Sequence, residues 1–174
     1  YKDYMLGLMF YKFLSDKTLE AFKVTSGLDT TSDRELQAEY EKAYDVYGHQ
    51  LENMINNVLG YYVSPKYTYQ SWLNDIDNGE FELDKVAESL NNFERTIAIT
   101  DETADFKGLF SGSSMDLSDT ALGSDLKARS DNIKALILLF ADLNMAKLQK
   151  GDVLGDAYEY LIGQFAMESG KKAG

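Results

Sequence analysis

The chain has 174 residues, a length that suits one domain with a hydrophobic core of its own. Asp and Glu number 29 against 17 Lys and Arg, so the formal net charge of −12 excludes DNA binding by an overall positive charge. There is no cysteine, which excludes disulfides and cysteine-based zinc sites, and no apolar run approaches the roughly 18 residues of a membrane span.

The first predicted helix opens the chain and has an apolar stripe wide enough to be buried on more than one side. The pattern continues more weakly through Leu19 and Phe22 to Gly27. The residues of the stripe are Met5, Leu6, Met9, Phe10, Phe13 and Leu14.

A second, long helix is predicted to begin at a capping box, Ser32-Asp33-Arg34-Glu35, in which Ser32 bonds free backbone N–H groups and Glu35 reaches back. Apolar residues then recur at steps of four and three, which predicts one continuous helix with a Tyr-rich seam that ends near Gly60. The seam consists of Leu36, Tyr40, Ala43, Tyr47, Leu51, Met54 and Val58.

The segment Tyr61–Pro65 is β-branched and aromatic and holds the only proline, which predicts an extended connector packed on the bundle. A short helix with Trp72, Leu73 and Ile76 should stop at Asn78-Gly79. The next helix has Glu82 and Asp84 near its N-terminal dipole. Its apolar residues are Leu83, Val86, Leu90, Phe93 and Ile97.

Residues 100–124 are rich in Gly, Ser and Asp and are predicted to form one long loop, pinned by Phe106, Leu109, Phe110 and Met115. Two further helices follow, and Ala135–Ala141 is interpreted as the buried centre of the first. Because no convincing strand pair occurs, we expect an all-α bundle of about six to seven helices with one extended connector and one long loop. The apolar residues of the last two helices are Leu126, Ile133, Leu136, Ile137, Phe140 and Leu143, and then Leu154, Tyr158, Leu161 and Phe165.

No pattern in the chain predicts a metal or catalytic site. Asp75–Glu82 is similar to a calcium loop, but from Asp75 the glycine falls at position five and Val86 takes the place of the final Glu ligand, so a helix-ending turn is favoured. His49 is the only histidine, and we interpret it as a surface or seam residue. The carboxylate pairs Glu39/Glu41 and Asp101/Glu102 show no sign of acid–base pairing.

The tyrosines of the second predicted helix, Tyr40, Tyr44 and Tyr47, could stack on nucleic-acid bases or pack in a core or an interface. Their neighbours are acidic, which favours packing. The acidic composition itself favours a solubilising surface over a face that docks on a basic partner. A local basic patch is the remaining route to DNA, and the best candidates, DNA- or hinge-facing, are Lys147, Lys150, Lys171 and Lys172. For Lys171 and Lys172 a linker is favoured.

The C-terminal sequence carries a family resemblance. Residues 154–165 read Leu-Gly-Asp-Ala-Tyr-Glu-Tyr-Leu-Ile-Gly-Gln-Phe, and Gly170-Lys171-Lys172-Ala173-Gly174 follows. This resembles the methyltransferase (M) subunit of type I restriction-modification systems, where such a helix leads to a Gly-Lys-Lys-x-Gly segment. The opening residues 1–17 resemble the family's first helix, and residues 106–111, with Leu117 and Leu122-Gly123, resemble a family loop.

The resemblance implies that residues 1–150 are the helical N-terminal domain of an M subunit. It also implies that residues 151–174 are a linking helix and loop leading to a catalytic domain absent from this sequence. The chain opens inside a helical pattern and ends after a helix, so we expect the natural protein to extend beyond both ends. The family's cofactor motif, aromatic-Thr-Pro, would follow Gly174.

For the parent protein the resemblance implies methyl transfer from S-adenosylmethionine to adenine N6 in DNA. It also implies a cytoplasmic complex with a specificity (S) subunit, a second M subunit and an endonuclease (R) subunit, in which the helical domain closes around DNA. The family's Asn/Asp-Pro-Pro-aromatic motif cannot exist in a chain with one proline, and no glycine-rich turn follows a strand. We therefore expect no catalytic residue, cofactor or metal site here. The alternative is a free-standing acidic helical adaptor.

Overall fold

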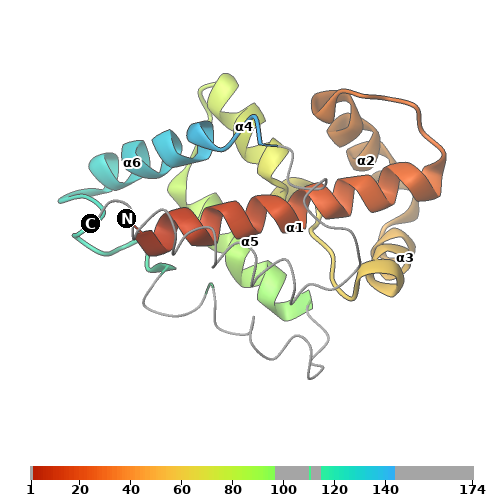
Figure 1. Ribbon diagram of the computed structural model, residues 1–174, viewed down its shortest axis with the longest axis horizontal. Helices are drawn as coiled ribbons and strands as arrows, with labels where there is room; N and C mark the ends of the chain where they lie inside the picture. The colour runs from red at the N-terminus through yellow and green to blue at the C-terminus, as the bar shows by residue number, and fades with distance from the viewer. Residues whose placement is uncertain (1, 97–109, 111–114, 144–174) are drawn as a thin grey trace, which may run out of the picture.

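The computed structural model describes residues 2–96, 110 and 115–143 (Figure 1). Within these residues the chain is helical with no strand, so the predicted all-α fold class is confirmed. The helices are α1 (Lys2–Ser26), α2 (Asp33–Tyr47), α3 (His49–Leu59), η1 (Pro65–Tyr67, a 3₁₀ turn), α4 (Tyr69–Asp77), α5 (Leu83–Thr96) and α6 (Leu126–Leu139).

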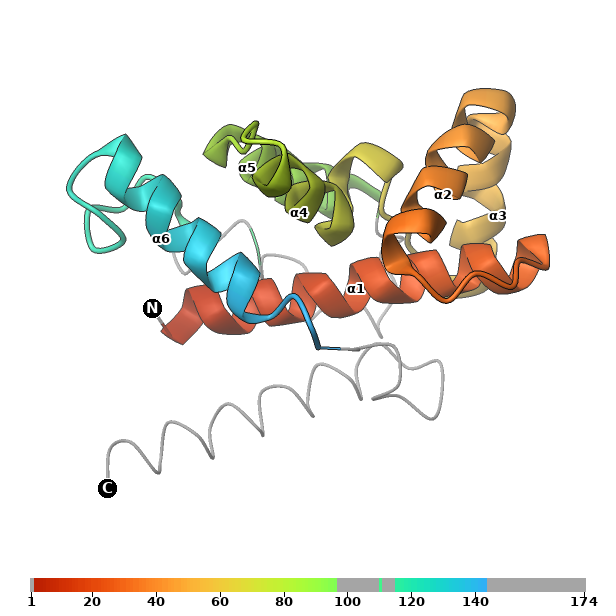
Figure 2. The ribbon, with the colours of Figure 1, turned by 90° about the horizontal axis from the view of Figure 1, so that it is seen from above.

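Helix α1 runs through the whole described part of the molecule and supports two groups of helices. Figures 1 and 2 show α6 over its N-terminal half and the pair α2 and α3 across its C-terminal end. We call α2 and α3 the helical arm. The prediction that the first helix continues through Leu19 and Phe22 is confirmed, because both side chains are buried and the helix ends at Ser26.

A main core surrounds the N-terminal half of α1 and is built from stacked aromatic rings. The Tyr11 ring lies 4.8 Å from the Trp72 ring and nearly parallel to it, and Phe93 meets Tyr11 edge-on at 6.1 Å. The polar atoms of these rings are bonded inside the core: the Tyr11 hydroxyl donates to the Tyr67 carbonyl at 2.8 Å, and Trp72 Nε1 donates to Ser89 Oγ at 3.0 Å. Burial of these rings therefore leaves no lost hydrogen bond.

A second, smaller cluster joins the C-terminal half of α1 to the arm. Within this cluster the rings of Phe22 and Tyr40 pack against each other, with their centroids 5.1 Å apart. Leu59, at the end of α3, packs against both this cluster and the main core. The buried residues of the arm cluster are Leu19, Phe22, Leu36, Tyr40, Leu51 and Ile55.

The prediction of one continuous helix over residues 33–59 is wrong. Gly48 takes φ 51° and ψ −122°, a backbone conformation that side-chain-bearing residues rarely adopt, and it ends α2 and begins α3. The seam is interrupted as a result. Leu36, Tyr40 and Leu51 are buried, but Tyr47 and Val58 are 59% and 50% exposed.

The capping box is confirmed in one half and wrong in the other. The backbone N–H of Glu35 donates to Ser32 Oγ at 3.3 Å, as expected of an N-cap serine. Glu35 does not reach back to the Ser32 backbone, because its carboxylate accepts from the Thr30 hydroxyl at 2.9 Å. The Ser32 N–H in turn donates to Thr30 Oγ1 at 3.4 Å.

The predicted extended connector is confirmed and is bonded tightly to the arm. Tyr61 and Val63 are buried, and the Val63 carbonyl accepts from the Tyr40 hydroxyl at 2.7 Å. Gln37 of α2, which is fully buried, donates to the Pro65 carbonyl at 2.7 Å and accepts from the Thr68 hydroxyl at 2.6 Å. These bonds attach α2 to the segment that leads into α4.

The described part of the loop before α6 is held by buried apolar side chains and by hydrogen bonds to α1 and α6. Phe110 and Met115 are buried as predicted, whereas Phe106 and Leu109 lie outside the described residues. The Tyr4 hydroxyl donates to the Asp116 carbonyl at 2.6 Å, and Asn132 donates to the Leu122 carbonyl at 2.6 Å. The start of α6 is thereby fixed against α1.

Helix α6 is buried on one face only. Ile133, Leu136, Ile137 and Phe140 contribute to the main core as predicted. The interpretation of Ala135–Ala141 as a buried helix centre is wrong in part, because Leu138 and Leu139 are exposed, and Leu126 and Leu143 are exposed as well. Within the described residues Leu126, Leu138 and Leu139 lie on the side of α6 away from the core, and Leu143 follows the end of the helix. The predicted seventh helix, at residues 154–165, lies outside the described residues.

Candidate functional site

The four lysines predicted as a DNA- or hinge-facing group, Lys147, Lys150, Lys171 and Lys172, lie outside the described residues. Their role therefore stays a prediction. The same applies to the pair Asp101 and Glu102 and to the proposed boundary at residue 150.

His49 lies on the surface, which is one of the two places predicted for it. It begins α3 instead of lying within a helix, and its side chain is 91% exposed. Its Nδ1 atom is 3.1 Å from Oε2 of Glu52, a carboxylate buried beneath it. No serine or cysteine nucleophile is bonded to it in the described contacts, so this pair does not have the geometry of a catalytic triad.

The Asp75–Glu82 segment is a helix-ending turn, as predicted. Helix α4 ends at Asp77, and Gly79 takes a positive φ of 72° while the Glu80 N–H donates to the Asp75 carbonyl at 2.8 Å. The Asp75 carboxylate pairs with Lys85 at 2.7 Å, and Asp77 pairs with Arg34 of α2. Within the described residues no three or more His, Cys, Asp or Glu side chains are grouped so that they could hold a metal ion.

The three tyrosines of α2 behave differently from one another. Tyr40 is a core residue as predicted, and burial raises the pKa of its hydroxyl far above the usual range. Tyr44 is half-buried, and its hydrogen bond to Glu52 raises its pKa. Tyr47 is 59% exposed, because the chain turns at Gly48 immediately after it, so it is not a core residue, and packing in an interface stays a prediction for it.

A cavity of about 560 Å³ lies between α5, Phe110, residues 115–118 and the start of α6. Its floor is apolar, with Leu83, Leu90 and Met115, and Asp84, Asp116 and Arg129 supply its charges. Hydrogen bonds from the Ser118 hydroxyl and backbone lower the pKa of Asp116, so this carboxylate is charged at neutral pH. Among the described lining residues the Ser118 hydroxyl donates to Asp116 at 2.5 Å, and the lowered pKa makes Asp116 a weaker base, which is the opposite of what general-base catalysis requires.

Sequence reasoning did not find this cavity. Its walls come from positions that are far apart in the sequence, and Arg129 and Asp116 are unremarkable in their local patterns. The structural neighbours of Arg129 show how closely the wall is packed: a Cβ on Gly123 would lie 2.5 Å from the Arg129 backbone nitrogen. The predicted resemblance of Leu122-Gly123 to a family loop thus falls on a glycine that close packing requires.

Three comparisons with known proteins bear on this arrangement. The family model described as the HsdM N-terminal domain matches residues 1–140. The chain belongs to this family. The HsdM domain defined by that match ends at residue 140, which is the C-cap of α6, so it includes every described helix.

The relatives of this HsdM domain are subunits of type I restriction systems. The type I restriction enzyme MpnII methylase subunit of Mycoplasma pneumoniae is 27% identical over 183 residues, which cover 100% of this chain and 32% of that protein. The crystal structure of a type I restriction-modification methyltransferase subunit from Streptococcus thermophilus matches with a TM-score of 0.78 and 33% identity, covering 95% of this chain and 34% of that one.

This chain therefore spans about a third of the length of these relatives. The prediction that it is the N-terminal helical domain of a type I M subunit is confirmed by the family match and by the fold. No helix among the described residues is both long and apolar enough to cross a membrane.

Proposed function

We propose that this HsdM domain is the assembly and DNA-clamping part of an adenine-specific type I DNA methyltransferase subunit. The observation that carries the proposal is the 0.78 TM-score and 33% identity to one third of the Streptococcus thermophilus methyltransferase subunit. The parent protein transfers a methyl group from S-adenosylmethionine to adenine N6 and works in the cytoplasm.

The proposal divides the work between this domain and the rest of the parent. Among the described residues, buried polar groups such as Gln37 and Thr68 hold helices together and are not arranged around an open reaction centre. S-adenosylmethionine and the catalytic motif belong to the other two thirds of the parent. This domain contributes binding and geometry, and it needs no cofactor of its own.

Charge supports a role through protein contacts. A domain with a formal charge of −12 gains little from phosphate contacts, whereas it can approach a basic protein surface favourably. We propose the S subunit, a second M subunit and the R subunit as partners, with DNA enclosed between two M copies. Any direct phosphate contact falls to Lys147, Lys150, Lys171 or Lys172.

The test compares the full parent M subunit, purified with its S subunit, with a version that lacks residues 1–174. The expected result is that the shortened protein keeps binding of S-adenosylmethionine, measured by calorimetry, but loses methyl transfer to DNA carrying the target site. The 174-residue chain alone should bind no S-adenosylmethionine. Binding by this chain with a Kd of about 1–10 μM, or full methyl transfer without it, would show that the proposed division is wrong.

The same test separates the alternative, a free-standing acidic adaptor, from the methyltransferase proposal. An adaptor would leave methyl transfer unchanged when it is removed. The similarity to one third of two methylase subunits favours the methyltransferase, since an adaptor would not share sequence and fold with both.

A further inference from the structure

Large apolar side chains are exposed on the helical arm and on the adjoining end of α1. Val46 and Tyr47 are 73% and 59% exposed at the end of α2, and Val24 is 74% exposed in the last turns of α1. Isolated exposed apolar residues are ordinary, but a group of them beside a hollow marks a contact surface.

Such a hollow lies where the ends of α1 and α2 meet the start of α3, at the arm end of the molecule (Figure 1). It has a volume of about 260 Å³, and its floor consists of Phe22, Ala43, Leu51 and Met54. Tyr47 forms part of its wall. We call this hollow the arm groove. It is smaller than the roughly 300–1,000 Å³ of small-molecule sites and suits one or two protruding side chains.

The arm groove is a direct consequence of the break at Gly48. An uninterrupted helix over residues 33–59 would continue past this point and would carry Tyr47 and Leu51 along one straight seam. The positive φ of Gly48 instead ends α2 at Tyr47, and the first turn of α3 then supplies Leu51 to the floor. The groove therefore belongs to the fold and not to one mobile side chain.

The charge of the segment around the arm groove indicates which charge a binding partner should carry. Residues 20–59 contain eight carboxylates against three Lys and Arg, a formal charge of −5 with His49 neutral. Helices α1 and α2 end at the groove and α3 begins there, so two negative dipole ends face one positive end; Lys23 lies in the last turn of α1, whereas α2 has no basic residue in its last turn. A basic occupant is attracted by this field, whereas an acidic one is repelled.

We propose that the arm groove binds an amphipathic helix of another protein, one with an apolar face flanked by Lys or Arg. An apolar residue of that helix enters the groove, and its neighbours one turn away cover Tyr47 and Val46. A second copy of this chain is a poor occupant, because both surfaces would carry a formal charge of −5. The inference goes beyond the proposed function, since the chemistry of the groove holds whether or not the parent methylates adenine.

The test uses a defined probe, a synthetic 16-residue amphipathic helix made of Leu and Lys, and a second peptide in which Glu replaces every Lys. Each is titrated into the ¹⁵N-labelled 174-residue chain and followed by NMR. The Lys peptide should shift the amide resonances of Ala43, Tyr47 and Leu51, with an affinity about ten-fold or more above that of the Glu peptide.

A matched pair of variants locates the binding. Tyr47→Ser removes an exposed wall of the groove, whereas Val58→Ser removes an exposed apolar residue of α3 that does not line it. Tyr47→Ser should weaken the Lys peptide about five-fold, and Val58→Ser should change its affinity by less than about two-fold. Both residues are exposed, so both variants should fold, which circular dichroism checks.

Four results would overturn the inference. One is a set of resonance shifts centred away from the groove, for example on the α4–α5 turn. Another is equal affinity for the Lys and Glu peptides, which would show that the acidic segment does not favour a basic partner. The third is equal affinity of the Tyr47→Ser and Val58→Ser variants for the Lys peptide. Concentration-dependent dimerisation with shifts at Tyr47 would assign the groove to a second copy instead and would equally contradict the proposal.

Discussion

The two halves of α1 are buried in different ways. The N-terminal half lies in a core of stacked rings that receives side chains from α4, α5, α6 and the connector. The C-terminal half shares a small cluster with the arm and ends in exposed residues such as Val24. A long helix can thus belong to two packing environments, and the better-packed one supplies most of its stability.

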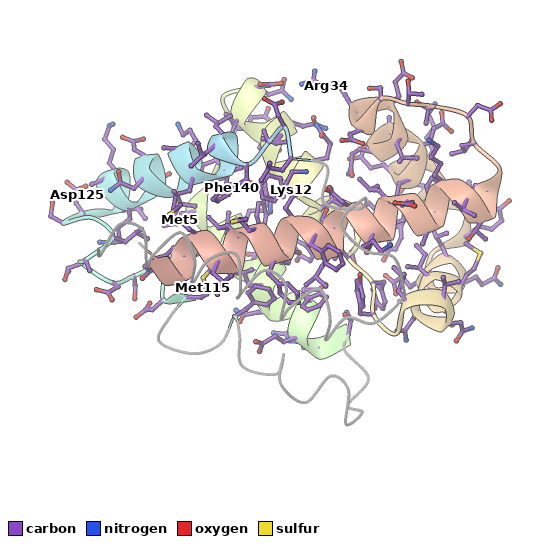
Figure 3. All side chains as sticks on the ribbon, in the orientation of Figure 1. Met5, Lys12, Arg34, Met115, Asp125 and Phe140 are labelled. Carbon is purple, nitrogen blue, oxygen red and sulfur yellow. The ribbon has the colours of Figure 1, made fainter. Side chains whose placement is uncertain are left out.

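Polar contacts compensate for the small apolar cluster of the arm. Gln37 and Tyr40 of α2 bond the connector at Pro65 and Val63, both at 2.7 Å and both buried. The main core has such bonds as well, at Tyr11 and Trp72, and it adds Lys12, near the middle of α1 (Figure 3), which pairs with Asp16 at 2.8 Å and lies over the Tyr69 ring. The arm is therefore attached by specific directional bonds, whose loss should uncouple it from the core.

The largest effect is expected in the main core. Trp72→Ala should lower the free energy of unfolding by about 3–5 kcal/mol, because the ring is fully buried, stacks on Tyr11 and donates to Ser89. Urea unfolding followed by circular dichroism measures the change. Val58→Ala on the exposed side of α3 is the control and should shift stability by less than about 0.5 kcal/mol. A loss below about 1 kcal/mol for Trp72→Ala would contradict the view that this core dominates.

The next effect tests the attachment of the arm. Gln37→Leu should cost roughly 1–3 kcal/mol, because it removes two buried hydrogen bonds and leaves the Pro65 carbonyl and the Thr68 hydroxyl only their longer bond to each other at 3.3 Å. Amide hydrogen exchange should quicken in α2 and α3 while α4 and α5 stay protected. The control is Gln70→Leu, which removes only a bond to Asn74 within α4. Uniform loss of protection in all helices would mean that arm and core unfold as one unit.

Alkaline pH should unfold the chain through its buried tyrosines. Burial raises the pKa values of Tyr11, Tyr40 and Tyr69 well above the ordinary 10.0, because the phenolate is poorly solvated in the core. A raised pKa in the folded state means that stability is fully present below pH 10 and is lost as the pH rises above it. Melting temperatures between pH 7 and pH 11 measure this loss.

The variant Tyr40→Phe measures the contribution of the arm to this pH dependence, because Tyr40 belongs to the arm cluster whereas Tyr11 and Tyr69 belong to the main core. At pH 7 the variant should have a free energy of unfolding about 1 kcal/mol lower than that of the unaltered chain, because the hydrogen bond to the Val63 carbonyl is lost. Above pH 10 its stability should fall less steeply with pH, because it has one buried hydroxyl fewer to ionise. Identical slopes for the two proteins would show that Tyr40 stays neutral in the unfolding step.

The smallest effect concerns the surface contact between arm and α4. The side chains of Arg34 and Asp77 form an ion pair but are 62% and 56% exposed, so Arg34→Met should change stability by less than about 0.5 kcal/mol. Lys12→Met, which breaks the buried pair with Asp16, should cost clearly more. The measurement is urea unfolding at low and high salt, and an Arg34→Met loss above about 1 kcal/mol would show that the surface pair fastens the arm.

Local signals in the sequence predicted many helix ends correctly. Ser32 caps α2, Gly60 ends α3 with a left-handed φ of 82°, and Asn78-Gly79 ends α4. These are properties of a few neighbouring residues, since capping hydroxyls and glycines act on the backbone next to them. The break at Gly48 was missed because apolar residues continue at steps of four and three across it, and a single glycine is tolerated within a helix.

The sites were harder to predict than the fold. The family could be named from short motifs at the two ends of the chain, but neither cavity follows from them. The arm groove combines Phe22 with Ala43 and Leu51, and the larger cavity combines α5 with α6. The one local signal was the apolar pair Val46-Tyr47 directly before a glycine, at a place where a helix could end.

The sequence by itself determined that this protein is all-helical, which segments form most of its helices, and to which family it belongs. These follow from periodicity, caps and motifs that act over a few residues. Only the tertiary structure decided that residues 33–59 form two helices, that Gln37 and Tyr40 fasten them to the connector, and that an acidic arm encloses an apolar groove. The reason is physical: burial and hydrogen bonding depend on which distant residues meet, and periodicity along one helix does not contain that information.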